Sequence, residues 1–163
     1  MQNKPIILIY DINNALVDDT AALLMQTNRY IVINTFNETN AMEVLHQHER
    51  GFGFLTNKLA CIITGWNSHK KPRDQFLYRI RERESFSDLR RPTPVILITE
   101  DHREDLKRRA LNPSHGGVSA YLHNDDYQKV LLDLMDQIVF QKKGRALARQ
   151  AFQEFVADDE DEG

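Results

Sequence analysis

The chain has 163 residues, of which 41% are hydrophobic and 28% charged, and its formal net charge is -3. These values fit one compact domain with an ordinary polar surface, and they exclude a wholly disordered chain or a second full domain. No apolar run approaches the roughly 20 residues that span a bilayer, and the start shows no signal-peptide pattern, so we expect a cytoplasmic protein without membrane contact. Cys61 is the single cysteine and lies in an apolar run, which indicates a buried, unreactive thiol.

Short apolar runs alternate with amphipathic segments along the whole chain. The runs predict five strands, at residues 5–10, 30–33, 59–63, 94–98 and 118–122. The segments between them predict helices at 15–26, 38–47, 74–83 and 103–111, and a long helix from 127 onward. Strand and helix in alternation are typical of parallel strands joined by right-handed helical crossovers. We therefore predict an α/β fold, a doubly wound (βα)5 three-layer sandwich around a five-stranded parallel sheet.

The carboxyl-terminal part has a different character. We predict that the sandwich comprises residues 1–140, followed by a helical extension over 141–156 and an acidic, disordered tail over 157–163. Leu147, Phe152 and Phe155 form a narrow apolar stripe on the extension. Such a stripe needs a partner, which can be the chain's own sheet layer, a second copy of the chain or another protein.

Candidate site residues follow the predicted strands. In an open parallel sheet, ligands bind beyond the carboxyl ends of the strands, near the point where strand order reverses. We expect a small polar pocket there. The residues at these positions are Asp11, Ile12, Asn13, Gly65, Trp66, Asn67, Thr99, Glu100 and Asn124.

Four segments carry a resemblance to a known family. They are residues 7–11, 62–67, 94–99 and 117–122. In this order they resemble the strand ends of a response-regulator receiver domain, the phosphoacceptor module of two-component signalling, over about residues 4–140. The resemblance implies a flavodoxin-like, receiver-like fold and a role in phosphorelay signal transduction.

The departures from the family pattern concern its chemistry. Phosphoryl transfer to a receiver needs a nucleophilic aspartate, a magnesium ion held by further acids, a lysine and a hydroxyl group. Against that pattern, Gly65 stands in place of the nucleophile, Ile12 in place of the second acid and Asn124 in place of the lysine. Only Asp11 and Thr99 remain. Because such groups act as a unit, the resemblance implies a degenerate pseudo-receiver that is not phosphorylated here.

Other chemistry has little support in the sequence. The six histidines include no pair at the spacing that shares a helix face, and no nucleophile motif or phosphate-binding loop is present, so we expect no enzyme activity, no metal and no cofactor. Residues 70–91 hold eight basic and four acidic side chains. We interpret this segment as a solvated helix and loop, with an acidic partner as the alternative and nucleic acid disfavoured. Trp66 is expected at the pocket rim, packed on the third helix, as an exposed aromatic.

The leading functional hypothesis is a non-catalytic protein-protein interaction module in bacterial-type signalling, independent of aspartyl phosphorylation. The resemblance implies a switch and partner face that includes Leu106, Tyr121 and Val130. Leu147, Phe152 and Phe155 would then serve a homodimer or another partner. Two alternatives stay open: a wing or oligomerisation domain like those of pyridoxal-phosphate-dependent basic amino-acid decarboxylases, and a flavodoxin-like protein that binds a small ligand.

Overall fold

The structure is a computed structural model that describes residues 4–49, 58–66, 75–85, 92–101 and 103–161. All pairings in its five-stranded sheet are parallel, and the strand order is β2-β1-β3-β4-β5. The strands are β1 (Ile6–Tyr10), β2 (Ile31–Thr35), β3 (Leu59–Thr64), β4 (Val95–Thr99) and β5 (Ala120–His123). The helices are α1 (Asn14–Met25), α2 (Glu38–Glu49), α3 (Phe76–Ser85), α4 (Glu104–Leu111), α5 (Gln128–Met135), the π-helix η3 (Asp136–Phe140) and α6 (Gly144–Asp161). The predicted fold class is confirmed.

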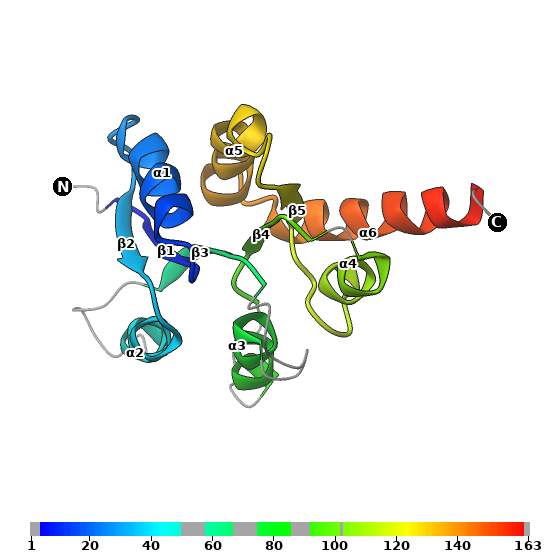
Figure 1. Cartoon of the computed structure of the whole chain (residues 1–163), viewed down its shortest axis with the longest axis horizontal. Coiled ribbons are helices and arrows are strands. Elements are labelled where there is room, and N and C mark those ends of the chain that lie inside the picture. The colour runs from blue at the N-terminus through cyan, green and yellow to red at the C-terminus, as the bar shows by residue number, and fades with distance from the viewer. Residues whose placement is uncertain (1–3, 50–57, 67–74, 86–91, 102, 162–163) are drawn as a thin grey trace.

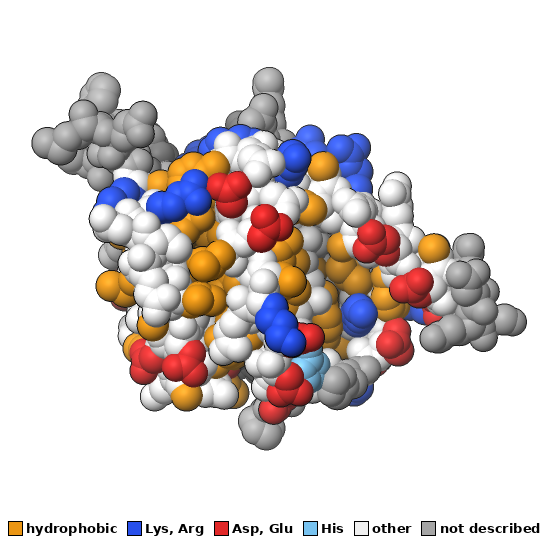
Figure 2. Space-filling view, turned by 90° about the horizontal axis from the view of Figure 1, so that it is seen from above, with side chains coloured by type: hydrophobic (Ala, Val, Ile, Leu, Met, Phe, Trp, Pro, Cys, Tyr) orange, Lys and Arg blue, Asp and Glu red, His pale blue; other side chains and the backbone are white. Residues whose placement is uncertain are grey.

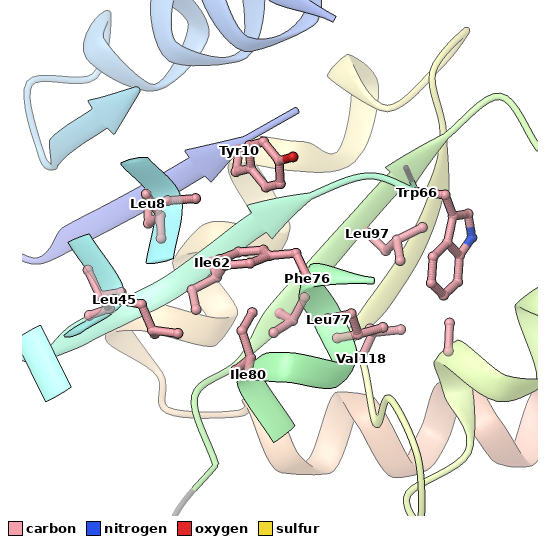
Figure 3. Packing of buried hydrophobic residues seen from close by; sticks show 14 of the residues in the cluster. Leu8, Tyr10, Leu45, Ile62, Trp66, Phe76, Leu77, Ile80, Leu97 and Val118 are labelled. Carbon is pink, nitrogen blue, oxygen red and sulfur yellow. The ribbon is translucent and has the colours of Figure 1, made fainter. Parts of the chain in front are cut away.

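Helices cover both faces of the sheet (Figure 1). Successive side chains of a strand point to opposite faces, so Leu8 and Ile62 belong to one buried cluster while Ile7 and Ile63 belong to the other. The first cluster also contains residues of α2, α3, α4 and α6, and the second contains residues of α1, α5 and η3. Figure 3 shows the first cluster, in which side chains of β1, β3 and β4 pack against α2 and α3. The continuous apolar strands are thus explained by a sheet that is covered on both sides.

Strand β5 begins at Ala120, two residues later than predicted. The preceding residues bond to the end of α4: the N–H groups of Gly116 and Val118 donate to the carbonyls of Arg109 and Ala110. Gly117 between them has a φ of 56°, a conformation that glycine adopts without steric cost. Val118, which the apolar pattern assigned to the strand, therefore uses its N–H in this turn.

The helical extension was predicted over residues 141–156, whereas helix α6 begins at Gly144 and ends later than predicted. Lys142 has a φ of 57° and separates η3 from α6. The hydroxyl of Ser119 donates to the Gly144 carbonyl at 2.7 Å, which ties the start of α6 to the core. Helix α6 continues through Asp161, so the prediction of disorder from residue 157 was wrong as far as 161. Acidic composition favours solvation, but here the helix has a packing partner in α4. Each helix among the described residues is too short or too polar to span a bilayer.

Candidate functional site

The candidate site lies where the strand order reverses, between β1 and β3. Tyr10 pairs with Thr64 at the ends of these strands, which places Asp11 beside Gly65 just beyond the sheet. Thr99 ends the neighbouring β4. The backbone N–H of Asn124 donates to the Thr99 carbonyl at 3.0 Å. The fold thus brings together residues from four different strand ends. Asn67 lies outside the described residues.

The carboxylate of Asp11 occupies the space beside Gly65. A Cβ atom at position 65 would overlap Oδ2 of Asp11 and would lie only 2.8 Å from the Ile98 carbonyl oxygen. The N–H of Asn13 donates to Oδ1 of Asp11 at 2.9 Å and holds the carboxylate in place. Position 65, which the resemblance assigns to the nucleophile, therefore has no side chain and no free volume for one.

Burial raises the pKa of the Asp11 carboxyl above its ordinary value. The hydrogen bond from the Asn13 N–H opposes this rise, and the negative charge of Glu100 adds to it. A raised pKa means that the ionised carboxylate is less favourable in the folded state than in the unfolded chain. Asp11 therefore lowers stability at neutral pH rather than contributing to it.

Asp11→Asn is expected to stabilise the protein at neutral pH. The amide removes the buried charge and keeps an oxygen that can accept from the Asn13 N–H. Between the unfolded and the raised folded pKa, wild-type folded protein binds more protons than the unfolded chain, so wild-type stability falls as pH rises through that window. The advantage of the variant should consequently shrink as pH is lowered through the folded pKa. Urea unfolding at about pH 4.5 and about pH 7 measures it.

The matched control for Asp11→Asn is Asp126→Asn. Asp126 is exposed, in the turn before α5. The control makes the same change from carboxylate to amide at the surface, where the charge of the carboxylate stays in contact with water. A gain of stability at neutral pH that is equal in both variants would contradict the burial argument.

Two of the other candidate residues, Ile12 and Thr99, have no acidic side chain. Ile12 is 52% exposed at the rim. The Thr99 hydroxyl is buried and accepts a hydrogen bond from the Asp101 N–H at 2.9 Å. Among the described residues, no group of three or more histidine, cysteine, aspartate or glutamate side chains could hold a metal ion. Among the described residues, the site thus offers one partly buried carboxylate, that of Asp11, and one hydroxyl that already accepts a hydrogen bond, without the group of acids that holds a magnesium ion.

Trp66 is only 8% exposed, so the prediction of an exposed aromatic was wrong. Its ring stacks on Tyr78 of α3, with centroids 6.1 Å apart, which confirms packing on the third helix. Its indole N–H donates to the Tyr121 hydroxyl at 3.2 Å. That hydroxyl lies 3.4 Å from the Asp101 carbonyl oxygen. Sequence reasoning identified Trp66 and Tyr121 separately but missed the hydrogen bond between them, because their distance along the chain gives no signal of contact.

Tyr121→Phe is expected to cost about 1 kcal/mol, the usual net value of a lost hydrogen bond, and to shift the protein's fluorescence. Trp66 is the only tryptophan, so its emission reports directly on the loss of this hydrogen-bond acceptor. Urea unfolding and the emission spectrum of the native state measure the two effects.

Tyr78→Phe provides the matched control for that substitution. The Tyr78 hydroxyl is buried and has no hydrogen-bond partner among the described residues, while its ring stacks on the same tryptophan. Removal of an unsatisfied buried hydroxyl should be neutral or stabilising. Equal losses of stability in the two variants would argue against a role for the Trp66–Tyr121 hydrogen bond.

The residues proposed for partner contact differ in exposure. Val130 is 43% exposed, but Leu106 is 6% exposed and belongs to the core. Phe155 is 7% exposed, and Phe152 and Leu147 pack against the two buried clusters. The stripe formed by Leu147, Phe152 and Phe155 therefore packs against the chain's own domain, one of the three partners considered for it. The periodicity of α6 revealed its apolar face, but nothing local in the sequence indicated α4 as its partner.

The basic segment is only partly described. Arg79 pairs with Glu38 at 3.0 Å. Arg81 pairs with Glu84 at 2.9 Å and also donates to the Gly116 carbonyl. Residues 70–74 and 86–91 lie outside the described ranges. Arg79 and Arg81 thus link α3 to neighbouring parts of the chain. The interpretation of the whole segment as a solvated helix and loop stays a prediction.

Comparison with solved structures agrees with the topology. A signal receiver domain of an HD domain-containing protein from Pseudomonas fluorescens matches with a TM-score of 0.60 and 21% identity, covering 98% of this chain and 95% of its own. A CheY-like receiver domain protein from Methanospirillum hungatei matches with a TM-score of 0.64 and 16% identity, covering 86% of this chain and 98% of its own. No family model and no curated protein matches the chain. At these identities the likeness shows the receiver fold.

Proposed function

We propose that this chain is a pseudo-receiver, a non-catalytic module that transmits signals through protein contact and does not depend on aspartyl phosphorylation. The receiver fold of its structural neighbours supports a signalling role. The observation that carries the proposal is the Asp11 carboxylate, which fills the space beside Gly65. The module needs no metal or cofactor.

Two independent features argue against phosphorylation. A phosphoryl group needs a nucleophile in line with a metal ion, and Gly65 supplies no atom that could attack. The resemblance assigns Ile12 to the position of the second acid of a magnesium site, and the exposed alkyl side chain of Ile12 has no ligand atom. A variant that restores only the nucleophile would still lack the second magnesium-binding acid, and the reverse also holds.

One face of the molecule suits a protein partner. Figure 2 shows a face on which hydrophobic, acidic and basic side chains are mixed. A nucleic-acid partner would call for a continuous basic patch, whereas mixed chemistry suits protein contact. We propose a cytoplasmic location, as is usual for signalling modules that act on protein partners, and self-association as one form of that contact.

Treatment of the full chain with acetyl phosphate and magnesium tests the proposal. The expected result is an unchanged intact mass, while a receiver domain with an aspartate at the equivalent position gains one phosphoryl group. A phosphoryl adduct on Asp11 or Asp101 would overturn the proposal. An absorbance spectrum of the same preparation from the near ultraviolet to the blue tests the alternatives that involve a bound flavin or pyridoxal phosphate.

A further inference from the structure

The exposed side of α6 consists of residues that repeat every four positions. The structure describes the side chains of residues 144–159 of this helix. The exposed ones are Arg145, Ala146, Arg149, Gln150, Gln153, Glu154, Ala157, Asp158 and Asp159. Asp159 pairs with Arg108 of α4 at 2.6 Å and so belongs to the contact with the domain. We name the other eight residues, which form two rows with a spacing of four, the outer face of α6.

The opposite side of α6 is held by the domain. Phe155 is buried in the first cluster, and Ala151 and Phe152 pack against that cluster. Leu147 packs against the second cluster. The outer face therefore points away from the sheet, and Figure 1 shows no other described helix or strand over it.

Charge is segregated along the outer face. Its first half carries two cations, Arg145 and Arg149, and no anion. Its second half carries two anions, Glu154 and Asp158, and no cation. Like charges four residues apart repel each other on a helix, and cations near the amino end and anions near the carboxyl end both oppose the helix dipole. This order of charges therefore lowers the stability of α6 by itself.

The same order is self-complementary. The residues of the outer face fall into pairs that share one midpoint, between Ala151 and Phe152. The pairs are Arg145 with Asp158, Ala146 with Ala157, Arg149 with Glu154, and Gln150 with Gln153. A twofold axis at the midpoint sets each residue against its pair in an antiparallel second copy. Each cation then meets an anion, the dipoles of the two helices oppose each other, and the glutamine amides can exchange hydrogen bonds.

The spacing also suits the packing of two helices. Residues that repeat every four positions form ridges inclined to the helix axis, and two such sets of ridges interlock when the helices cross at about −50°. The pairs nearest the midpoint lie at the crossing, so Arg149 and Glu154 are the charges that approach most closely. Gln150 Nε2 donates to Glu154 Oε1 at 3.0 Å, which holds this carboxylate on the outer face. Within the described part of the chain, neither Arg149 nor Asp158 forms an ion pair.

We propose that the outer face of α6 is the contact surface of a symmetric homodimer, in which two α6 helices cross in antiparallel orientation. A second copy is the occupant because its own outer face supplies the matching charge at every charged position. Exposed ion pairs are individually weak, so the dimer is reversible and weakens as salt is raised. The inference deepens the proposed function and rests on it only in that the chain acts through contact with protein.

Sedimentation velocity of the full chain, over a range of concentrations at low and at high salt, tests the inference. Wild type should form a dimer at low salt and dissociate at high salt. Arg149→Glu sets like charges against each other at two symmetry-related places and should weaken the dimer about tenfold or more. The combined exchange Arg149→Glu with Glu154→Arg should restore it. Lys129→Glu on α5, an exposed position with the same change in net charge, is the matched control and should have no effect.

Two further variants separate a second copy from a different partner. Arg145→Glu with Arg149→Glu leaves only acids on the outer face, and Glu154→Lys with Asp158→Lys leaves only bases. Neither variant should associate with itself, whereas their equimolar mixture should form a heterodimer. All four positions are exposed, and both sets of charges suit the helix dipole, so circular dichroism should show folded protein.

Three results would overturn the inference: a wild type that stays monomeric at every concentration in low salt, a dimer that responds equally to Arg149→Glu and Lys129→Glu, or a mixture of the two complementary variants that does not associate. The first would leave the outer face to a different partner. The assay contains no phosphodonor, so its failure leaves independence from phosphorylation untouched.

Discussion

Gly65→Ala is expected to destabilise the protein by about 1–3 kcal/mol, the usual cost of adding atoms to a packed space. The new Cβ would overlap the Asp11 carboxylate and lie 2.8 Å from the Ile98 carbonyl oxygen. The carboxylate can rotate away, but the carbonyl belongs to the backbone of β4 and cannot. Urea unfolding followed by circular dichroism and tryptophan emission measures the loss.

Gly65→Asp should destabilise more than Gly65→Ala, because it places a second carboxylate beside one that is already partly buried. It should still give no phosphorylated protein, since the second metal-binding acid is missing. A stable Gly65→Asp variant that accepts a phosphoryl group would show that the site had lost only its nucleophile.

A double-mutant cycle with Asp11→Ala provides the control for position 65. In that background one of the two obstacles to a side chain is gone, so Gly65→Ala should cost less than in wild type. The destabilisation that remains in this background measures the clash of the new Cβ with the Ile98 carbonyl oxygen. Equal costs in the two backgrounds would show that the Asp11 carboxylate does not restrict position 65.

Phe155→Ala is the second substitution with a large expected effect. Loss of a buried phenylalanine ring usually costs about 3 kcal/mol or more, and here the loss should fall mainly on the docking of α6. Phe155 shares the first buried cluster with residues of the sheet, but the buried residues of the second cluster, which also come from β1, β3 and β4, include none from α6. Hydrogen exchange should therefore show deprotection of α6 amides, while β1, β3 and β4 stay protected.

Phe140→Ala is the matched control for the loss of a phenyl ring. Phe140 is 42% exposed at the end of η3, so its removal should cost much less than that of Phe155. Protection of α6 that is equal in Phe155→Ala and wild type would contradict the assignment of Phe155 as the anchor of this helix.

The fold was predictable because its main signals are local. Runs such as residues 6–10 and 95–99 are apolar throughout, which in a short segment indicates a strand covered on both faces. Helical spacing between the runs then leaves parallel crossovers as the simplest connection. The boundary of β5 was less predictable, because Gly116 and Val118 bond to α4 rather than to a strand.

The composition of the site was predictable, but its packing was not. The lack of a side chain at Gly65 and the alkyl side chain of Ile12 are visible in the printed sequence. The Asp11 carboxylate fills the space at Gly65 only because β1 pairs with β3. This pairing joins segments about 50 residues apart in the chain. The burial of Trp66 likewise follows from contacts with α3 and β5.

Periodic apolar patterns specify which residues of a segment share a face, because strand and helix geometry repeat every 2 and about 3.6 residues. They therefore specified the layers of this protein, the stripe on α6 and the chemical character of each strand end. They carry no information on which distant segment meets a given face. Long-range packing decided three features: the docking of Phe155 on α4, the helical structure of residues 157–161 and the contact of Trp66 with Tyr121. In each of them, burial and charge pairing act between parts that are remote in the chain.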